Sequence, residues 1–262
     1  MKRILLLSTL FALLGLLPAD AVRYRSITGS GVLRTETRDV KSYTGLNVSR
    51  GIAATLADGT PGKLVVEADE RILPYVETKI DAQGVLHLGI SSEVQSIRNC
   101  TIRIAVPLPD SFDKLSASSG ATAACRSVVT TPALDAQASS GARIEIAFDG
   151  EKCTLAASSG AGIKANLSAE RCHIKASSGA DVSAKGRAAE CRIDVSSGAS
   201  CKARNLQTTR TEARASSGAA IRIACSETLD AGASSGGSIS YWGDCRLVNY
   251  KKNRTGSVTH KR

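Results

Sequence analysis

The sequence predicts an all-β protein built as a parallel β-helix, and three observations lead to this prediction. The tripeptide Ser-Ser-Gly recurs seven times at a nearly constant interval. Between the repeats, apolar and polar residues alternate. When the repeats are aligned on their glycines, apolar residues occupy the same positions in each one. A period of about 20 residues indicates small structural units that stack on their neighbours.

The repeated glycines predict the corners of the coils. They stand at Gly120, Gly141, Gly160, Gly179, Gly198, Gly218 and Gly236, at intervals of 21, 19, 19, 19, 20 and 18 residues. Glycine adopts positive φ without the penalty that a Cβ brings, so we expect the seven to lie in one line along the helix axis. Alternation sends the first of the two serines outward and the second inward, where its hydroxyl must find a partner in the stack or a corner backbone group.

The segments between the corners predict strands. Apolar side chains occupy every second residue, as in Cys172-His173-Ile174-Lys175-Ala176, and a period of two is typical of a strand with one buried face. No window shows a helical stripe. Equivalent residues of successive coils should stack about 4.8 Å apart, which would place Ala176 between Ala157 and Val195.

Four columns of residues, three and five positions before and after each glycine, are predicted to face inward. The column three positions before the glycine is almost entirely alanine: Ala117, Ala138, Ala157, Ala176, Val195, Ala215 and Ala233. Small side chains let the two walls of a coil approach closely, so we expect a thin, flattened cross-section.

The regions outside the repeats divide the chain. Residues 1–21 carry Lys2 and Arg3, an apolar run and Ala19-Asp20-Ala21, which predicts a secretory signal peptide cleaved after Ala21 and an exported protein without a transmembrane segment. Residues 22–114 read as irregular β coils or a cap on the open end, residues 115–250 as the repeats, and residues 251–262 as a basic tail. The exported protein would reside in the periplasm, at the cell surface or outside the cell.

Two stretches resemble a known family. They are GSGVLRTETRDVKSYTGLNVSRGIAATLADGTPGKLVVEAD with VETKIDAQGVLHLGI, and the Ser-Ser-Gly coils with GGSISYWGDCRLVNYKKNRTGSV. Together they make the chain similar to the exported bacterial proteins described as putative auto-transporter adhesin, head GIN domain. The resemblance covers nearly all of the chain after residue 21, although Cys245 stands where a proline is usual. It implies a right-handed β-helix and an adhesive role, and it supplies no catalytic residues.

Eight cysteines in an exported chain invite a disulfide framework. However, Cys153, Cys172 and Cys191 each stand seven residues before a glycine, in one core column. Stacked neighbours have parallel Cβ vectors that suit a disulfide poorly, and a free cysteine behaves as a small buried hydrophobe. We therefore expect a buried thiol ladder, with disulfide pairing as the alternative.

Catalytic and metal-binding chemistry is not predicted. The histidines are scattered, whereas a zinc site needs convergent ligands, so neither a metal nor another cofactor is expected. The nearest approach to a catalytic carboxylate pair is Glu212 with Asp230, on adjacent coils beside Arg192. A polysaccharide-active lyase or glycosidase is therefore the alternative function, and it would need these carboxylates to converge in a cleft.

The charge balance indicates anionic partners. Removing residues 1–21 leaves 32 Lys and Arg against 23 Asp and Glu, a net charge of +9, which attracts anionic surfaces. Aromatic residues make up only 3% of the chain, so stacking of nucleic-acid bases is not expected. The sequence predicts a non-enzymatic structural or adhesive module for an anionic cell-surface or polysaccharide ligand. An ice-binding face of outward serines is a third interpretation, and the oligomeric state is left open.

Overall fold

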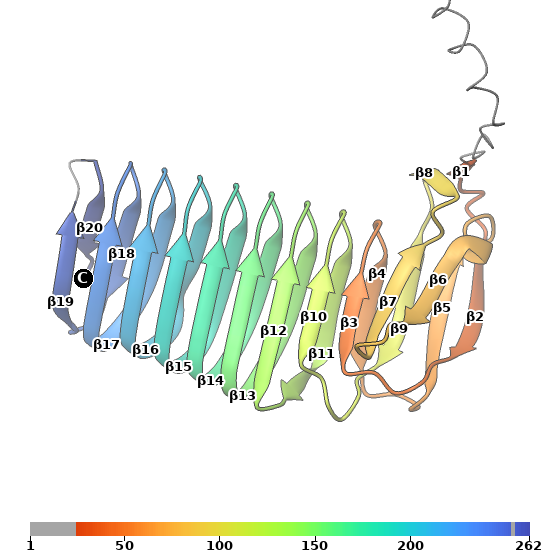
Figure 1. The fold of residues 1–262 in the computed structure, drawn as a ribbon, viewed down its shortest axis with the longest axis horizontal. Helices are drawn as coiled ribbons and strands as arrows, with labels where there is room; N and C mark the ends of the chain where they lie inside the picture. Colours follow the sequence, from red (N-terminus) through yellow and green to blue (C-terminus); the bar gives the residue numbers. More distant parts are fainter. Residues whose placement is uncertain (1–24, 253–254) are drawn as a thin grey trace, which may run out of the picture.

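The computed structural model describes residues 25–252 and 255–262, and it is a right-handed parallel β-helix (Figure 1). The predicted signal peptide and its cleavage after Ala21 lie outside the described residues. Most of the described chain is strand, and one 3-10 turn, η1 (Leu73–Tyr75), interrupts it. The fold class predicted from the repeats is therefore confirmed.

Each coil has two strand-forming walls. Wall A is formed by the residues that precede each Ser-Ser-Gly turn, and wall B by those that follow it. The repeat strands are β10 (Lys114–Ala117), β11 (Thr122–Thr130), β12 (Ala133–Ala138), β13 (Arg143–Ala157), β14 (Gly162–Ala176), β15 (Asp181–Val195), β16 (Ser200–Ala215), β17 (Ala220–Ala233) and β18 (Ser238–Trp242). The strands from β13 to β17 each cross from wall B to wall A, and all of these neighbours pair in parallel.

The last coil reaches into the segment predicted as a basic tail. It consists of β19 (Arg246–Lys252), which pairs with β17 on wall A, and β20 (Ser257–His260), which pairs with β18 on wall B. Strand pairing thus continues past residue 250.

The N-terminal region both continues the helix and covers its end. Its strands are β1 (Arg25–Thr28), β2 (Leu33–Asp39), β3 (Gly45–Val48), β4 (Ala53–Ala57), β5 (Lys63–Asp69), β6 (Val76–Ile80), β7 (Val85–Ile90), β8 (Val94–Arg98) and β9 (Ile102–Pro107). The coil formed by β3 and β4 lies between the coil of β7 and β9 and that of β10 and β11, so spatial order departs from chain order. Beyond it, β2 pairs with β5, β5 with β9 and β6 with β7, all antiparallel. These strands cover the edge that the parallel stack would leave open.

The Ser-Ser-Gly corners are type I′ turns. In the first, Ser119 and Gly120 both have positive φ, 51° and 72°, and the Ala121 amide donates to the Ser118 carbonyl at 3.1 Å. The same pair of conformations recurs at all seven repeats, with φ of 48–53° at the serine and 69–76° at the glycine.

The inward position predicted for the second serine is wrong. Ser119 and its counterparts are exposed, because two consecutive left-handed residues reverse the chain and end the alternation. The glycine amide bonds along the axis instead, as Gly120 does to the Ser140 carbonyl at 3.0 Å.

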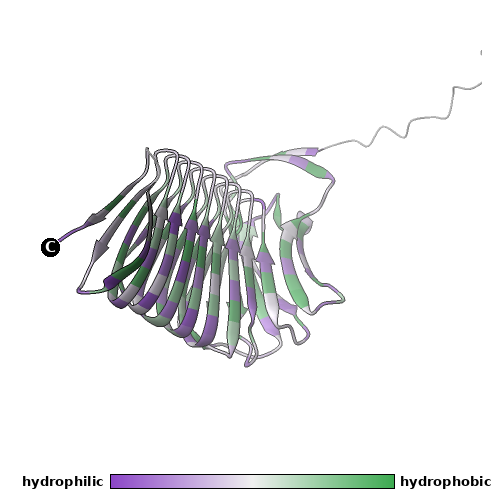
Figure 2. Cartoon of the chain, turned by 60° about the vertical axis from the view of Figure 1, so that its left-hand side comes forward, coloured by the Kyte–Doolittle hydropathy of each residue, from purple (hydrophilic) through white to green (hydrophobic). Residues whose placement is uncertain are grey.

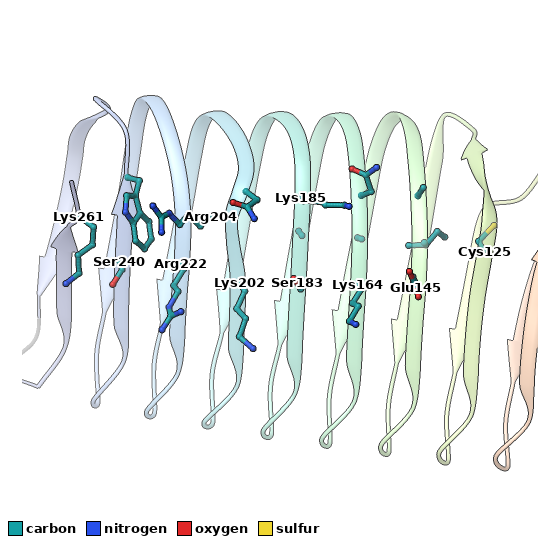
Figure 3. Close-up of a pocket in the computed structure, with 17 residues that line it drawn as sticks. Cys125, Glu145, Lys164, Ser183, Lys185, Lys202, Arg204, Arg222, Ser240 and Lys261 are labelled. Atoms are coloured by element: carbon teal, nitrogen blue, oxygen red, sulfur yellow. The ribbon is translucent and has the colours of Figure 1, made fainter.

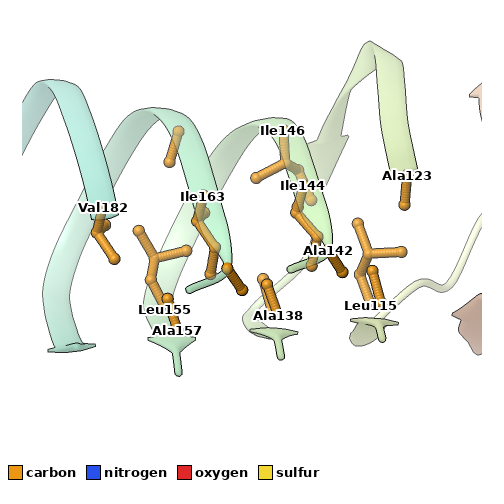
Figure 4. Close-up of a cluster of buried hydrophobic side chains, with 14 of the residues drawn as sticks. Leu115, Ala123, Ala138, Ala142, Ile144, Ile146, Leu155, Ala157, Ile163 and Val182 are labelled. Carbon is orange, nitrogen blue, oxygen red and sulfur yellow. The ribbon is translucent and has the colours of Figure 1, made fainter. Parts of the chain in front are cut away.

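The core follows the predicted columns. Ala176 is in register with Ala157 on one side and Val195 on the other, as predicted, and larger side chains such as Leu155 and Ile163 fill the space beside them (Figure 4). A further buried alanine column directly follows the corner glycines and was not anticipated: Ala121, Ala142, Ala161, Ala180, Ala199 and Ala219. In Figure 2, apolar and polar residues alternate along the strands. Every second residue of a strand therefore faces outward and belongs to the outer surface.

Candidate functional site

A basic groove runs along the outside of wall B, from Cys125 on β11 to Trp242 on β18 (Figure 3). Its volume is about 830 Å³. Six cationic side chains line it, and one carboxylate, Glu145, lies toward its β13 end. The six cations are Lys164, Lys185, Lys202, Arg204, Arg222 and Lys261. The unequal numbers make this groove a strongly electropositive part of the described surface.

The repeat positions these cations. Glu145, Lys164, Ser183, Lys202 and Arg222 are direct register partners on successive strands, four residues after each corner glycine. Because side chains alternate across a strand, residues at this position all project to the same outer face. Lys185 and Arg204, six residues after their glycines, form a second row beside the first.

Most of the groove cations have no acidic partner within the described part of the chain. Lys202 is paired with Asp181, with 2.7 Å between Nζ and Oδ2. The other five have no carboxylate within ion-pair distance among the described residues. Arg204 instead lies over the indole ring of Trp242, with 4.6 Å between the guanidinium carbon and the ring centroid.

Wall A carries charges of both signs, and several of them form ion pairs with one another. A shallower hollow there is lined by four Lys and Arg side chains and three carboxylates. Arg192 bonds to Asp194 at 2.8 Å and to Glu212 at 3.0 Å. His173 also contacts Asp194, at 2.9 Å. Exposed ion pairs of this kind stabilise a fold little, but the hollow on wall A has nearly balanced charges, whereas the groove on wall B has six cations against one carboxylate.

The carboxylates considered for catalysis belong to that network. Glu212 and Asp230 are register partners on adjacent strands, as the repeat predicted. Arg214 contacts both, at 3.2 Å from Glu212 and 2.9 Å from Asp230, and Arg192 adds a second cation to Glu212. The two carboxylates therefore lie close together, and both are engaged in ion pairs with arginines.

The cysteines of the predicted ladder lie in register on β13, β14 and β15, and all three are buried. A hydrogen bond with Cys172, together with burial, raises the pKa of Cys153 well above its usual range. Since the thiolate is the reactive form, this thiol is inert at neutral pH. The eight cysteines are free thiols in the structure, and the ladder stays a prediction for the protein in an oxidising compartment.

The corner glycines are linked from turn to turn by bonds such as that from the Gly141 amide to the Ser159 carbonyl, and they line no part of the basic groove. The groove cations themselves were not singled out from the sequence. The available signal was the fourth position after each glycine, which reads Lys164, Ser183, Lys202 and Arg222 in consecutive repeats.

The described residues contain neither a candidate metal site nor a helix that could span a membrane. No cluster of three or more His, Cys, Asp or Glu side chains in residues 25–252 and 255–262 is arranged to hold a metal ion. Within the same residues, no helix has the length and apolar character needed to cross a bilayer.

Comparisons with solved structures identify the fold. A crystal structure described as a putative lipid binding protein from Parabacteroides distasonis superposes with a TM-score of 0.82 at 18% identity, covering 91% of this chain and 100% of that one. A putative adhesin from Parabacteroides merdae gives 0.80 at 16% identity, covering 90% and 99%. A putative adhesin from Bacteroides fragilis gives 0.65 at 18% identity, covering 90% and 100%. At these identities the likeness concerns architecture alone.

The sequence itself provides the family. No curated protein matches it. The family described as putative auto-transporter adhesin, head GIN domain, matches residues 42–245, which span the inner N-terminal coils and nearly all of the Ser-Ser-Gly repeats. The chain therefore belongs to the putative auto-transporter adhesin, head GIN domain family, as the resemblance of its repeats indicated.

Proposed function

We propose that the protein is an exported, non-enzymatic adhesive module that binds anionic polymers at a cell surface. The observation that carries this proposal is the basic groove of wall B, where six cations face one lining carboxylate. Opposite charges attract across such a surface and draw a charged partner to it. The descriptions of the family and of similar structures as adhesins agree with a binding role.

Binding to a charged polymer tests the proposal. We expect the protein to be retained on immobilised dextran sulfate and not on uncharged dextran, which has the same sugar backbone. Retention should weaken as salt rises, because salt screens exposed charges separated by more than a Debye length of about 10 Å at 0.1 M.

The combined variant Lys164→Gln, Lys185→Gln, Arg222→Gln removes three groove cations that have no ion-pair partner among the described residues. A basic residue near an anionic surface contributes about 1 kcal/mol, so we expect the dissociation constant for dextran sulfate to rise roughly 100-fold. The matched control, Lys152→Gln, Arg171→Gln, Lys175→Gln, makes the same charge change on wall A. Its loss of binding free energy should be less than a quarter of the loss in the groove variant. Equal losses in the two variants would assign the binding to net charge and contradict a site on wall B.

The enzymatic alternative has its own expected result. Because Arg192 and Arg214 hold Glu212 and Asp230 in ion pairs, we expect no cleavage of acidic or neutral polysaccharides by the protein. The measurement is release of reducing ends and of unsaturated products, with the double variant Glu212→Gln, Asp230→Asn as control. If the parent released products and the double variant did not, the enzymatic alternative would be correct and the non-enzymatic proposal wrong.

A further inference from the structure

The shape of the groove and the aromatic residue in it restrict the class of ligand further than its charge does. Its two rows of cations run along the helix axis, with successive strands about 4.8 Å apart. Between Lys164 on β14 and Lys261 after β20 lie five strand intervals, or roughly 24 Å. A compact anion would contact two or three of these side chains, whereas a linear anion along the axis would contact all of them.

One end of the groove carries the chain's only tryptophan. Trp242 is half-buried at the end of β18 and lines the groove. Arg204, from the strand two coils earlier, lies over one face of its ring, so a sugar ring would stack on the opposite face. An indole offers a flat apolar face with a polar N–H at its rim. Such a face suits a pyranose ring, whose C–H bonds form an apolar face and whose hydroxyls lie at its edge.

Neutral hydrogen-bonding side chains lie between the cations. They are Asn166, Ser183, Asn205 and Ser240. Amides and hydroxyls donate and accept hydrogen bonds, as sugar hydroxyls do, and a phosphate chain without hydroxyls would leave half of that capacity unused. Glu145 lies near the end of the groove opposite Trp242, where its carboxylate repels an anionic ligand.

From these observations we propose that the groove binds a linear acidic polysaccharide of the polyuronate type, lying along the helix axis with one sugar ring stacked on Trp242. This inference rests on the proposed function, since it names the ligand class of the same groove. The cations neutralise the carboxylates of successive sugars, and Trp242 distinguishes a sugar polymer from other polyanions.

Calorimetric titration with two probes tests the inference: oligogalacturonates of increasing length, and inorganic polyphosphate. For the parent we expect affinity for oligogalacturonate to rise with length until the chain spans roughly 24 Å and then to level off. Trp242→Ala should weaken binding of the longest oligogalacturonate about tenfold, the scale of one aromatic contact. Its binding of polyphosphate should change less than twofold.

Two variants control for structural effects. Trp242→Phe keeps a ring and should retain most of the oligogalacturonate affinity, and Val248→Ala removes an exposed apolar side chain outside the groove and should change neither affinity. Equal losses of both ligands in Trp242→Ala would overturn the stacking role. Anionic phosphatidylglycerol vesicles that bound more tightly than every oligogalacturonate would overturn the ligand class.

The result also separates this inference from the proposed function. If the three-cation groove variant bound dextran sulfate as well as the parent, the proposed function would fail and this inference with it. That variant could instead lose dextran sulfate binding while Trp242→Ala changed the affinities for oligogalacturonate and polyphosphate equally. The proposed function would then be supported, and only the assignment of a polyuronate ligand would be wrong.

Discussion

Replacement of Gly186 by alanine is expected to lower the free energy of unfolding by about 4 kcal/mol or more, in the range reached only by severe single substitutions. Gly186 lies on β15 with φ of +106°. A Cβ built on it would stand 2.1 Å from the Leu167 carbonyl oxygen, a backbone atom of the neighbouring strand. A non-glycine residue in such a conformation costs about 1–3 kcal/mol, and displacement of a paired strand adds to that cost.

Gly179→Ala provides the matched control for this prediction. Gly179 also has positive φ, +71°, but a Cβ there would meet nothing within 4 Å among the described residues beyond its chain neighbours. The backbone conformation alone then sets the cost, at about 1–2 kcal/mol. Urea unfolding of both variants measures the difference. Equal losses would show that β15 moves away from Leu167 without penalty.

The second large effect is expected from Phe148→Ala, which should destabilise the fold by about 3–5 kcal/mol. Phe148 is 1% exposed and lies in register between Val129 and Leu167. These residues form the corner column opposite the Ser-Ser-Gly turns. Deleting the ring leaves a cavity that strands fixed by hydrogen bonds on both sides cannot close.

Val128→Ala is the control for the cavity, because Val128 lies next to the same column but is 56% exposed. Its effect should stay within about 0.5 kcal/mol. Thermal and urea unfolding report both values. A loss below about 1 kcal/mol for Phe148→Ala would mean that the corner column repacks, contrary to close packing of the interior.

The regular part of the fold could be predicted from the sequence because its determinants are local. The alternation around Ile174 is visible within one repeat and the spacing of the corner glycines between successive repeats, and stacking then places Ala157, Ala176 and Val195 in one column. Ser178 was misplaced because its positive φ belongs to a turn type, which the alternation of the strands does not encode.

The remaining features depend on pairing between distant segments. Ser49-Arg50-Gly51-Ile52 forms the same turn as the repeats, with Arg50 at φ +58° and Gly51 at +74°, but Arg50 in place of the second serine concealed it. The position of that coil between β7 and β10 is likewise set by long-range pairing. The groove also required the fold, because Lys164 and Lys202 become near neighbours only when their coils stack.

The parallel stacking of the coils gives the molecule a regular step along its axis. Every repeat from β13 to β17 adds one strand spacing to both walls, and the register shifts between β15, β16 and β17 do not interrupt the stacking. An in-frame duplication or loss of one repeat would therefore lengthen or shorten both walls by one strand spacing while the core on either side kept its packing. The length of the outer surface can thus change by copy number, independently of the side chains that each repeat presents on it.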